Sequence, residues 1–74
     1  IKPSEFTERT SELMAQLTAE YFAPEEVAVI TGGPEVAAAF SSLPFDHLVF
    51  TGSTATGRRV MQAAAANLVP VTLE

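Results

Sequence analysis

Two short segments of the chain repeat one pattern and limit the folds that it can adopt. Val-Ile-Thr-Gly occupies residues 29–32, and Val-Phe-Thr-Gly occupies residues 49–52. Each is an apolar, β-branched run without the alternation of a half-buried strand, and each ends in Thr-Gly before a helix-forming stretch. Alternating buried strands and helices favour right-handed crossovers and a parallel sheet with helices on its faces. The pattern therefore predicts the α/β class, with a three-layer parallel sheet.

The residues before the first repeat predict an amphipathic helix. Thr7 is a suitable N-cap, and Ala23-Pro24 should end the helix because the residue before a proline is pushed out of the helical region. Apolar side chains recur at helical spacing along one face of this segment, namely Leu13, Met14, Leu17 and Tyr21.

Strands and helices alternate along the rest of the chain. Strands are expected at residues 27–31, 47–51 and 69–74, with helices beginning at Pro34 and after Ser53. Asn67 is expected to end the last helix in a left-handed conformation, and Pro70 lies near the start of the last strand. The residues expected to form the buried face of that helix are Gly57, Val60, Met61, Ala64 and Leu68.

Composition excludes several classes of protein. The chain has 74 residues, enough for at most one small domain, and its 18% charged and 47% hydrophobic residues suggest a segment cut from a larger fold. It has no Cys, so it lacks a disulfide scaffold, a Cys-based metal site and a catalytic thiol. The lone His47 is expected at the surface, and no metal site is expected. A net charge of −5 argues against nucleic-acid binding, and no apolar run approaches the roughly 18 residues of a membrane span. We expect a soluble, cytoplasmic protein.

The turn at residues 52–57 is the sharpest local signal for a ligand. Gly52 permits close backbone approach, Ser53 can cap the helix and offer a hydroxyl to phosphate, and Gly57 lies on the packing stripe where a helix approaches a sheet. The segment is neither a G-x-G-x-x-G fingerprint nor a Walker P-loop. Nucleotide binding and an ordinary strand-to-helix turn both remain open on this pattern alone.

Charged residues near both ends of the chain are further candidates. Lys2 and Glu5 flank a turn and could share a ribose, or form a solvated pair of small energetic weight. Glu74 ends an apolar strand, where a carboxylate could act in acid–base chemistry or be a solvated residue. Because ligands bind at the carboxyl ends of parallel strands, both Thr-Gly turns, residues 2–5 and Glu74 should share one edge.

Three motifs in register make the whole chain resemble the aldehyde dehydrogenase superfamily. They are Lys2-Pro3-Ser4-Glu5, Phe50-Thr51-Gly52-Ser53-Thr54-x-x-Gly57 and Val71-Thr72-Leu73-Glu74. Residues 43–50 look most like the coniferyl aldehyde dehydrogenase branch. The resemblance implies that residues 1–74 are a fragment of a Rossmann-like NAD(P)-binding domain. It also implies that Lys2 and Glu5 bind the adenosine ribose, with Ser4 beside them, and that Glu74 is the general base. The residues that it places against the pyrophosphate and nicotinamide are Thr51, Gly52, Ser53, Thr54 and Gly57.

The implied activity is NAD-dependent oxidation of an aldehyde to a carboxylic acid through a thioester, with NADP as a possible second cofactor. The family's Cys nucleophile is absent, so this chain alone is expected to be inactive and its parent to be the enzyme, as a homo-oligomer. Two alternatives are a non-catalytic nucleotide-binding or packing module and the phosphate-binding turn of an unrelated α/β enzyme.

Overall fold

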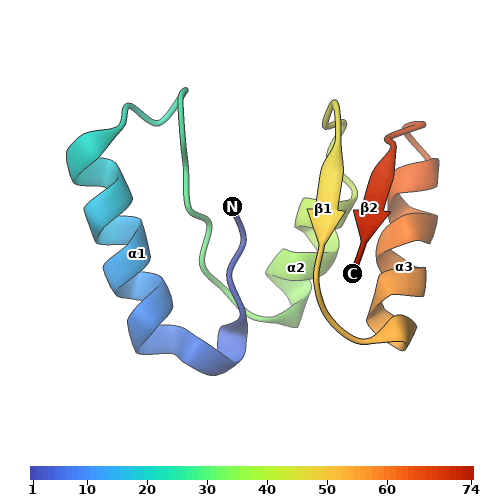
Figure 1. Cartoon of the computed structure of the whole chain (residues 1–74), viewed down its shortest axis with the longest axis horizontal. Helices are drawn as coiled ribbons and strands as arrows, with labels where there is room; N and C mark the ends of the chain where they lie inside the picture. The colour runs from blue at the N-terminus through green and yellow to red at the C-terminus, as the bar shows by residue number, and fades with distance from the viewer. The chain divides into compact units, whose positions relative to one another are not determined.

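A computed structural model describes all 74 residues of the chain, which form two compact units, residues 1–37 and residues 38–74. The boundary between the two units lies within the helix α2 (Pro34–Ser41) (Figure 1). The elements in chain order are the 3₁₀ turn η1 (Glu5–Thr7), α1 (Glu8–Tyr21), α2 (Pro34–Ser41), β1 (Leu48–Phe50), α3 (Thr54–Ala65) and β2 (Val71–Leu73).

The second unit is built on a parallel pair of strands. β1 and β2 lie side by side with Leu48 opposite Val71 and Phe50 opposite Leu73, and α3 lies against them (Figure 1). The prediction of parallel pairing is confirmed for these two strands. Pro70 accepts a hydrogen bond from the Leu48 N–H at 3.0 Å, and its lack of an N–H falls just before the first residue pair of the ladder, Leu48 and Val71. The buried core of this unit consists of Leu48, Val60, Ala64 and Val69, with Phe45, Phe50 and Val71 packed against it.

The end of α3 differs from the prediction. Leu68, not Asn67, adopts the left-handed conformation, with φ 54°. Hydrogen bonds from the Val69 N–H to the Ala64 carbonyl and from the Leu68 N–H to the Ala65 carbonyl form a Schellman motif. This motif buries Val69 against Ala64 and leaves Leu68 90% exposed, because the left-handed residue points its side chain outward.

The apolar faces expected on two helices are only partly buried. Gly57, Val60 and Ala64 are buried on α3 as predicted, but Met61 is 51% exposed. On α1 the covered positions are the small residues Ser11, Ala15 and Thr18. The larger apolar side chains that recur at helical spacing on α1, namely Leu13, Met14, Leu17 and Tyr21, are all exposed within this unit. Small side chains line its packed face instead.

The predicted strand at residues 27–31 is not formed. Ile1 pairs with this segment through two hydrogen bonds, from its own amino group to the Ala28 carbonyl at 2.7 Å and from the Ile30 N–H to its carbonyl at 2.8 Å. The two bonds have the pattern of a parallel ladder around one residue. A single pairing residue is too short to make a strand, so the β-branched run remains a connecting segment.

The first helical turn begins earlier than expected. Thr7 occupies the cap position of α1, but its hydroxyl makes no capping hydrogen bond. Instead Ser4 caps the preceding turn η1, where its Oγ accepts a hydrogen bond from the Phe6 N–H at 3.2 Å. The Lys-Pro-Ser-Glu motif therefore leads directly into helical structure.

Leu68→Gly should stabilise the chain. A left-handed leucine costs about 1–2 kcal/mol relative to a conformation that it prefers, and its exposed side chain contributes little packing. We expect the free energy of unfolding in urea to rise by about 1 kcal/mol. The matched control, Ala66→Gly, changes a right-handed residue and should lower that free energy. Equal losses in both variants would contradict the role assigned to φ at Leu68.

Candidate functional site

The backbone brings Gly52 and Glu74 together at the carboxyl end of the strand pair. The Glu74 N–H donates to the Phe50 carbonyl at 2.9 Å, and the Gly52 N–H donates to the Glu74 carbonyl at 3.2 Å. These two bonds continue the parallel ladder beyond the last residues of β1 and β2. The expectation that the second Thr-Gly turn and Glu74 share an edge is therefore met in this unit. Both residues are exposed there and accessible to a ligand.

Ser53 begins α3 as the sequence predicts. Its Oγ accepts a hydrogen bond from the Thr56 N–H at 3.2 Å and donates one to the Thr56 Oγ1 at 3.0 Å. The Gly57 N–H donates to the Ser53 carbonyl at 2.8 Å and closes the first turn. Thr51 and Thr54 flank this turn and are exposed. The site thus presents hydroxyl groups at the positive end of a twelve-residue helix, a favourable place for an anion.

The two glycines of this turn have different roles. A Cβ on Gly52 would lie 2.6 Å from Cζ of the Phe50 ring, so this position needs a residue without a side chain. A Cβ on Gly57 would lie 3.8 Å from both Leu73 and Phe50, which is ordinary van der Waals contact. Gly57 is buried on the packing stripe as predicted, and the space beside it would also admit a methyl group.

The Lys-Pro-Ser-Glu motif carries an ion pair in the first unit. The Lys2 Nζ donates to the Pro3 carbonyl at 2.8 Å and lies 3.4 Å from the Glu5 Oε2. The Lys2 side chain is only 9% exposed. A backbone hydrogen bond at Glu5, together with the Lys2 ammonium, lowers the pKa of the Glu5 carboxyl from its usual value. Glu5 is therefore an ionised acceptor at neutral pH, suited to hydroxyl donors.

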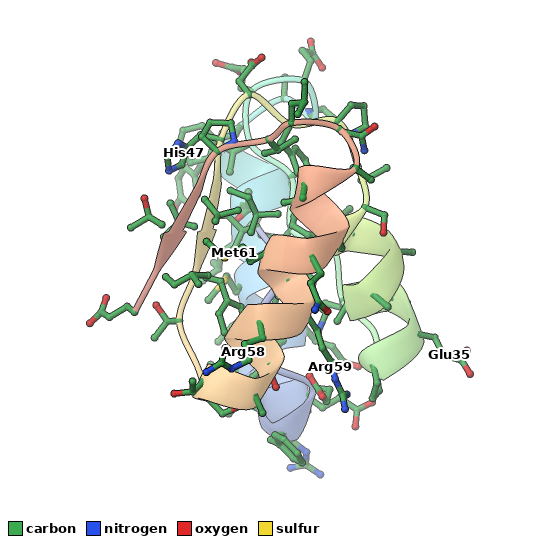
Figure 2. All side chains as sticks on the ribbon, turned by 90° about the vertical axis from the view of Figure 1, so that its right-hand side faces the viewer. Glu35, His47, Arg58, Arg59 and Met61 are labelled. Atoms are coloured by element: carbon green, nitrogen blue, oxygen red, sulfur yellow. The ribbon has the colours of Figure 1, made fainter.

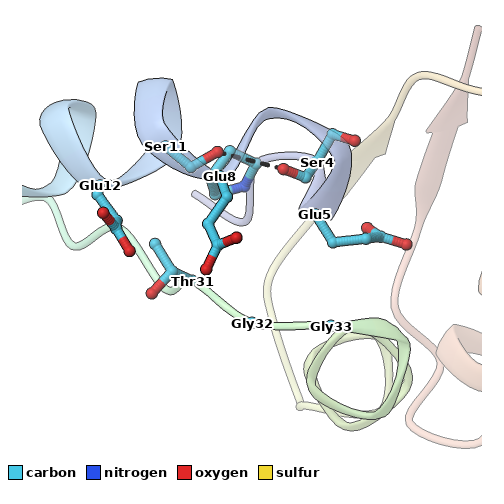
Figure 3. A pocket seen from close by; sticks show the side chains of 9 residues that line it. Ser4, Glu5, Glu8, Ser11, Glu12, Thr31, Gly32 and Gly33 are labelled. Carbon is cyan, nitrogen blue, oxygen red and sulfur yellow. Dashed lines mark hydrogen bonds between the residues drawn. The ribbon is translucent and has the colours of Figure 1, made fainter.

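A cleft of about 330 Å³ opens beside this motif (Figure 3). It lies between the start of α1 and the first Thr-Gly turn, and it contains both Ser4 and Glu5. Gly32 has φ 147° and a Cβ there would lie 2.5 Å from Val36, whereas a Cβ on Gly33 would meet no atom within 4 Å. The residues that line the cleft are Pro3, Ser4, Glu5, Glu8, Ser11, Glu12, Thr31, Gly32 and Gly33.

Ser11 holds one wall of the cleft in place. It is the one buried polar residue of the chain, at 4% exposure, and its Oγ donates to the Ser4 carbonyl at 3.2 Å (Figure 3). The Thr7 Oγ1 donates to the same carbonyl at 3.3 Å. Two hydroxyls from successive helical turns therefore fix the Lys-Pro-Ser-Glu turn against α1.

Residues that line the cleft but were missed in the sequence are Glu8, Ser11 and Glu12. Ser11 and Glu12 come three and four residues after Glu8, so the three side chains lie on one face of α1, and Glu5 lies three residues before Glu8 in the preceding turn η1. Helical periodicity could therefore have identified them. In the sequence, the helical spacing of these polar residues is a weaker signal than that of the larger apolar residues of the same helix.

The candidate residues fall into two groups. Lys2, Ser4 and Glu5 belong to the first unit, and residues 51–57 with Glu74 belong to the second. That Lys2 and Ser53 share one edge stays a prediction, since the two groups lie in different units. The structure contains no cluster of three or more His, Cys, Asp or Glu side chains arranged to hold a metal, and none of its helices has the length and apolar character needed to cross a membrane.

Two groups of side chains lie outside the candidate site. His47 precedes β1 and is exposed, with its Nε2 2.8 Å from the Thr72 Oγ1 (Figure 2). Arg58 and Arg59 extend from the early turns of α3 (Figure 2). The expectation that His47 is a surface residue is confirmed, and its partner is a threonine hydroxyl.

The sequence model of the aldehyde dehydrogenase family matches residues 1–74. This chain belongs to the aldehyde dehydrogenase family. It is 65% identical over all its residues to a probable coniferyl aldehyde dehydrogenase of Caulobacter vibrioides and 58% identical to the coniferyl aldehyde dehydrogenase of a Pseudomonas species. In each case it covers 15% of the relative's length.

A solved structure of Staphylococcus aureus AldH in its substrate-bound state supports the same assignment. It matches the whole chain with a TM-score of 0.96 and 47% identity, and the chain covers 16% of it. The aldehyde dehydrogenase fold is therefore shown for this segment as a mixed arrangement of helices with two parallel strands.

Alanine at the two turn glycines should have opposite effects. Gly57→Ala adds a methyl that fits and raises helix propensity, so the free energy of unfolding should increase by about 0.5–1 kcal/mol. Gly52→Ala forces the Phe50 ring out of its packing and should cost about 1–3 kcal/mol. Urea denaturation of both variants checks this. A loss at Gly57 as large as that at Gly52 would show that α3 packs more tightly than the structure indicates.

Ser11→Ala should loosen the Lys-Pro-Ser-Glu turn. It removes a buried hydroxyl and leaves the Ser4 carbonyl with Thr7 as its hydroxyl donor. We expect a loss of about 1 kcal/mol in the free energy of unfolding. Thr10→Ala, an exposed change on the same helix, should stay within about 0.5 kcal/mol of the unchanged protein. The assignment is wrong if both variants unfold at the same urea concentration.

Proposed function

We propose that this chain is a segment of the NAD(P)-binding domain of an aldehyde dehydrogenase that oxidises an aldehyde to a carboxylic acid. The chain spans about 15% of the length of its relatives, so the activity belongs to the longer protein. The observation that carries the proposal is the hydrogen bond between Gly52 and Glu74, because it sets the Gly-Ser-Thr turn beside the candidate base in a chain of this family. A three-layer, Rossmann-like sheet would be completed by strands from the rest of the protein.

The residues present fit a dinucleotide. The cleft of the first unit offers the Glu5 carboxylate and the Ser4 hydroxyl to the hydroxyls of a ribose, with open space at Gly33. Lys2 would hold the Glu5 carboxylate in place through their ion pair. In the second unit the Ser53 and Thr54 hydroxyls and the start of α3 would receive the pyrophosphate. When bound, NAD(P) accepts the hydride from the aldehyde carbon.

Glu74 would act as general base in the second half of the reaction. Its carboxylate would take a proton from the water that hydrolyses the thioester formed on a Cys nucleophile. This chain contains no Cys, so the nucleophile must come from the rest of the protein. The backbone bond to Gly52 would hold the Glu74 main chain still while its side chain reaches the water.

Aromatic aldehydes are the first substrates to test, because two of the most similar relatives are named coniferyl aldehyde dehydrogenases. We further propose that the whole enzyme is a cytoplasmic homo-oligomer.

Glu74→Gln in the full-length protein should lower kcat for coniferyl aldehyde with NAD at least about 100-fold, the usual contribution of a general base. The KM for NAD should change little, because the amide keeps the shape of the side chain. Glu20→Gln, an exposed change on α1, is the control. Steady-state kinetics of NADH formation measure both. An unchanged kcat would remove Glu74 from the mechanism, and nucleotide binding without turnover in the unchanged protein would favour a non-catalytic module.

Lys2→Ala should act on cofactor binding instead. Loss of the ammonium frees the Glu5 carboxylate from its partner, so the KM for NAD should rise about five- to tenfold with kcat nearly unchanged. Arg9→Ala removes an exposed cation on the same unit and should leave both constants as they are. A fall in kcat at constant KM would contradict the assignment of Lys2 to the ribose.

A further inference from the structure

The ring of Phe50 fills the space beside the Gly-Ser-Thr turn. A Cβ on Gly52 would have three atoms of this ring as its nearest neighbours, with Cζ at 2.6 Å, Cε1 at 3.1 Å and Cε2 at 3.4 Å. Gly52 does not adopt a positive φ, so the ring, and not the backbone conformation, excludes a side chain at this position. The far end of the Phe50 ring therefore lies directly against the backbone of the turn.

The same ring also faces the first turn of α3. A Cβ on Gly57 would lie 3.8 Å from the Cδ1 and Cε1 atoms of Phe50. On its other side the ring packs against the buried core cluster, and the Phe50 carbonyl accepts the Glu74 N–H at 2.9 Å. One half-buried residue thus adjoins the Gly52 turn, the start of α3 and the backbone of the candidate base.

We propose that Phe50 is a positioning residue, whose ring holds the Gly-Ser-Thr turn where its hydroxyls and the start of α3 receive the cofactor pyrophosphate. The inference rests on the proposed function. The hydrogen bonds between Ser53 and Thr56 fix the local shape of the helix start but not its distance from β1. At the turn itself, that distance depends on the backbone bond of Gly52 and on the ring that fills the space beside it.

Truncation of the ring in the full-length protein tests the proposal. Phe50→Leu removes Cζ and both Cε atoms, which leaves a gap beside Gly52 and lets the turn move. Phe45→Leu is the matched control, because Phe45 is also half-buried and packs against the same core cluster, yet none of its atoms is among the nearest neighbours of either turn glycine. Calorimetry measures the Kd for NAD of each variant, and circular dichroism establishes that each is folded at the temperature used.

Phe50→Leu should raise the Kd for NAD about tenfold, because a displaced turn loses part of its contact with the ligand, whereas Phe45→Leu should change it less than about twofold. Both variants should lower the melting temperature, since both remove apolar atoms from the same core. Binding of NAD therefore separates a positioning role from a contribution to stability alone.

A second substitution refills the gap. A Cβ on Gly52 would occupy the space that Phe50→Leu vacates, so the double variant Phe50→Leu/Gly52→Ala should bind NAD with a Kd within about threefold of the unchanged protein. Gly52→Ala alone should weaken binding, because its methyl group meets the intact ring. If Phe50→Leu does not fold, Gly52→Ala takes its place in the comparison, and adding Phe50→Leu to it should lower the Kd again.

Equal Kd values for Phe50→Leu and Phe45→Leu overturn the inference, and so does a double variant that binds NAD no better than the single variant. Either result leaves the proposed function intact. Failure of the unchanged full-length protein to bind NAD overturns the proposed function itself.

Discussion

The structure of the second unit depends on the parallel backbone pairing that continues past the ends of β1 and β2. Because the Glu74 N–H reaches the Phe50 carbonyl and the Gly52 N–H reaches the Glu74 carbonyl, both strands leave the ladder at the same level. The turn into α3 must then start at Gly52. Ser53 falls at the cap position as a consequence, so the geometry of the candidate site follows from the register of the ladder rather than from contacts among its side chains.

Phe50 links this site to the hydrophobic core. Its ring packs against the core cluster and also covers Gly52, where it leaves no room for a Cβ. A change in core packing would therefore move the turn, and a side chain at Gly52 would disturb the core. The small size of the core, four buried residues, makes this coupling strong because few other contacts could compensate.

The sequence predicted the features that depend on local chemistry or on strong periodicity. Ser53 caps α3, β1 and β2 are parallel, and Glu74 lies beside the Gly52 turn, as expected. The wrong predictions have a common cause. A residue pattern shows which conformation a segment prefers, but it does not show whether another segment is there to pair or pack with it. The run at 27–31 has strand composition, yet only Ile1 pairs with it. At the end of α3, burial of Val69 decides which residue becomes left-handed, and that long-range demand places Leu68 where Asn67 is locally better suited.

The two Thr-Gly segments share one sequence pattern but lead into two different local structures. After Thr31, the pair Gly32-Gly33 turns the chain with a positive φ and leaves open space, which becomes part of a cleft lined by side chains from α1. After Thr51, a single glycine is followed by Ser53, whose hydroxyl stays at the helix start and is bonded to Thr56. The residue that follows the first glycine therefore decides the outcome. A second glycine leaves open space that becomes part of a cleft, and a serine gives a compact polar helix start suited to a phosphate.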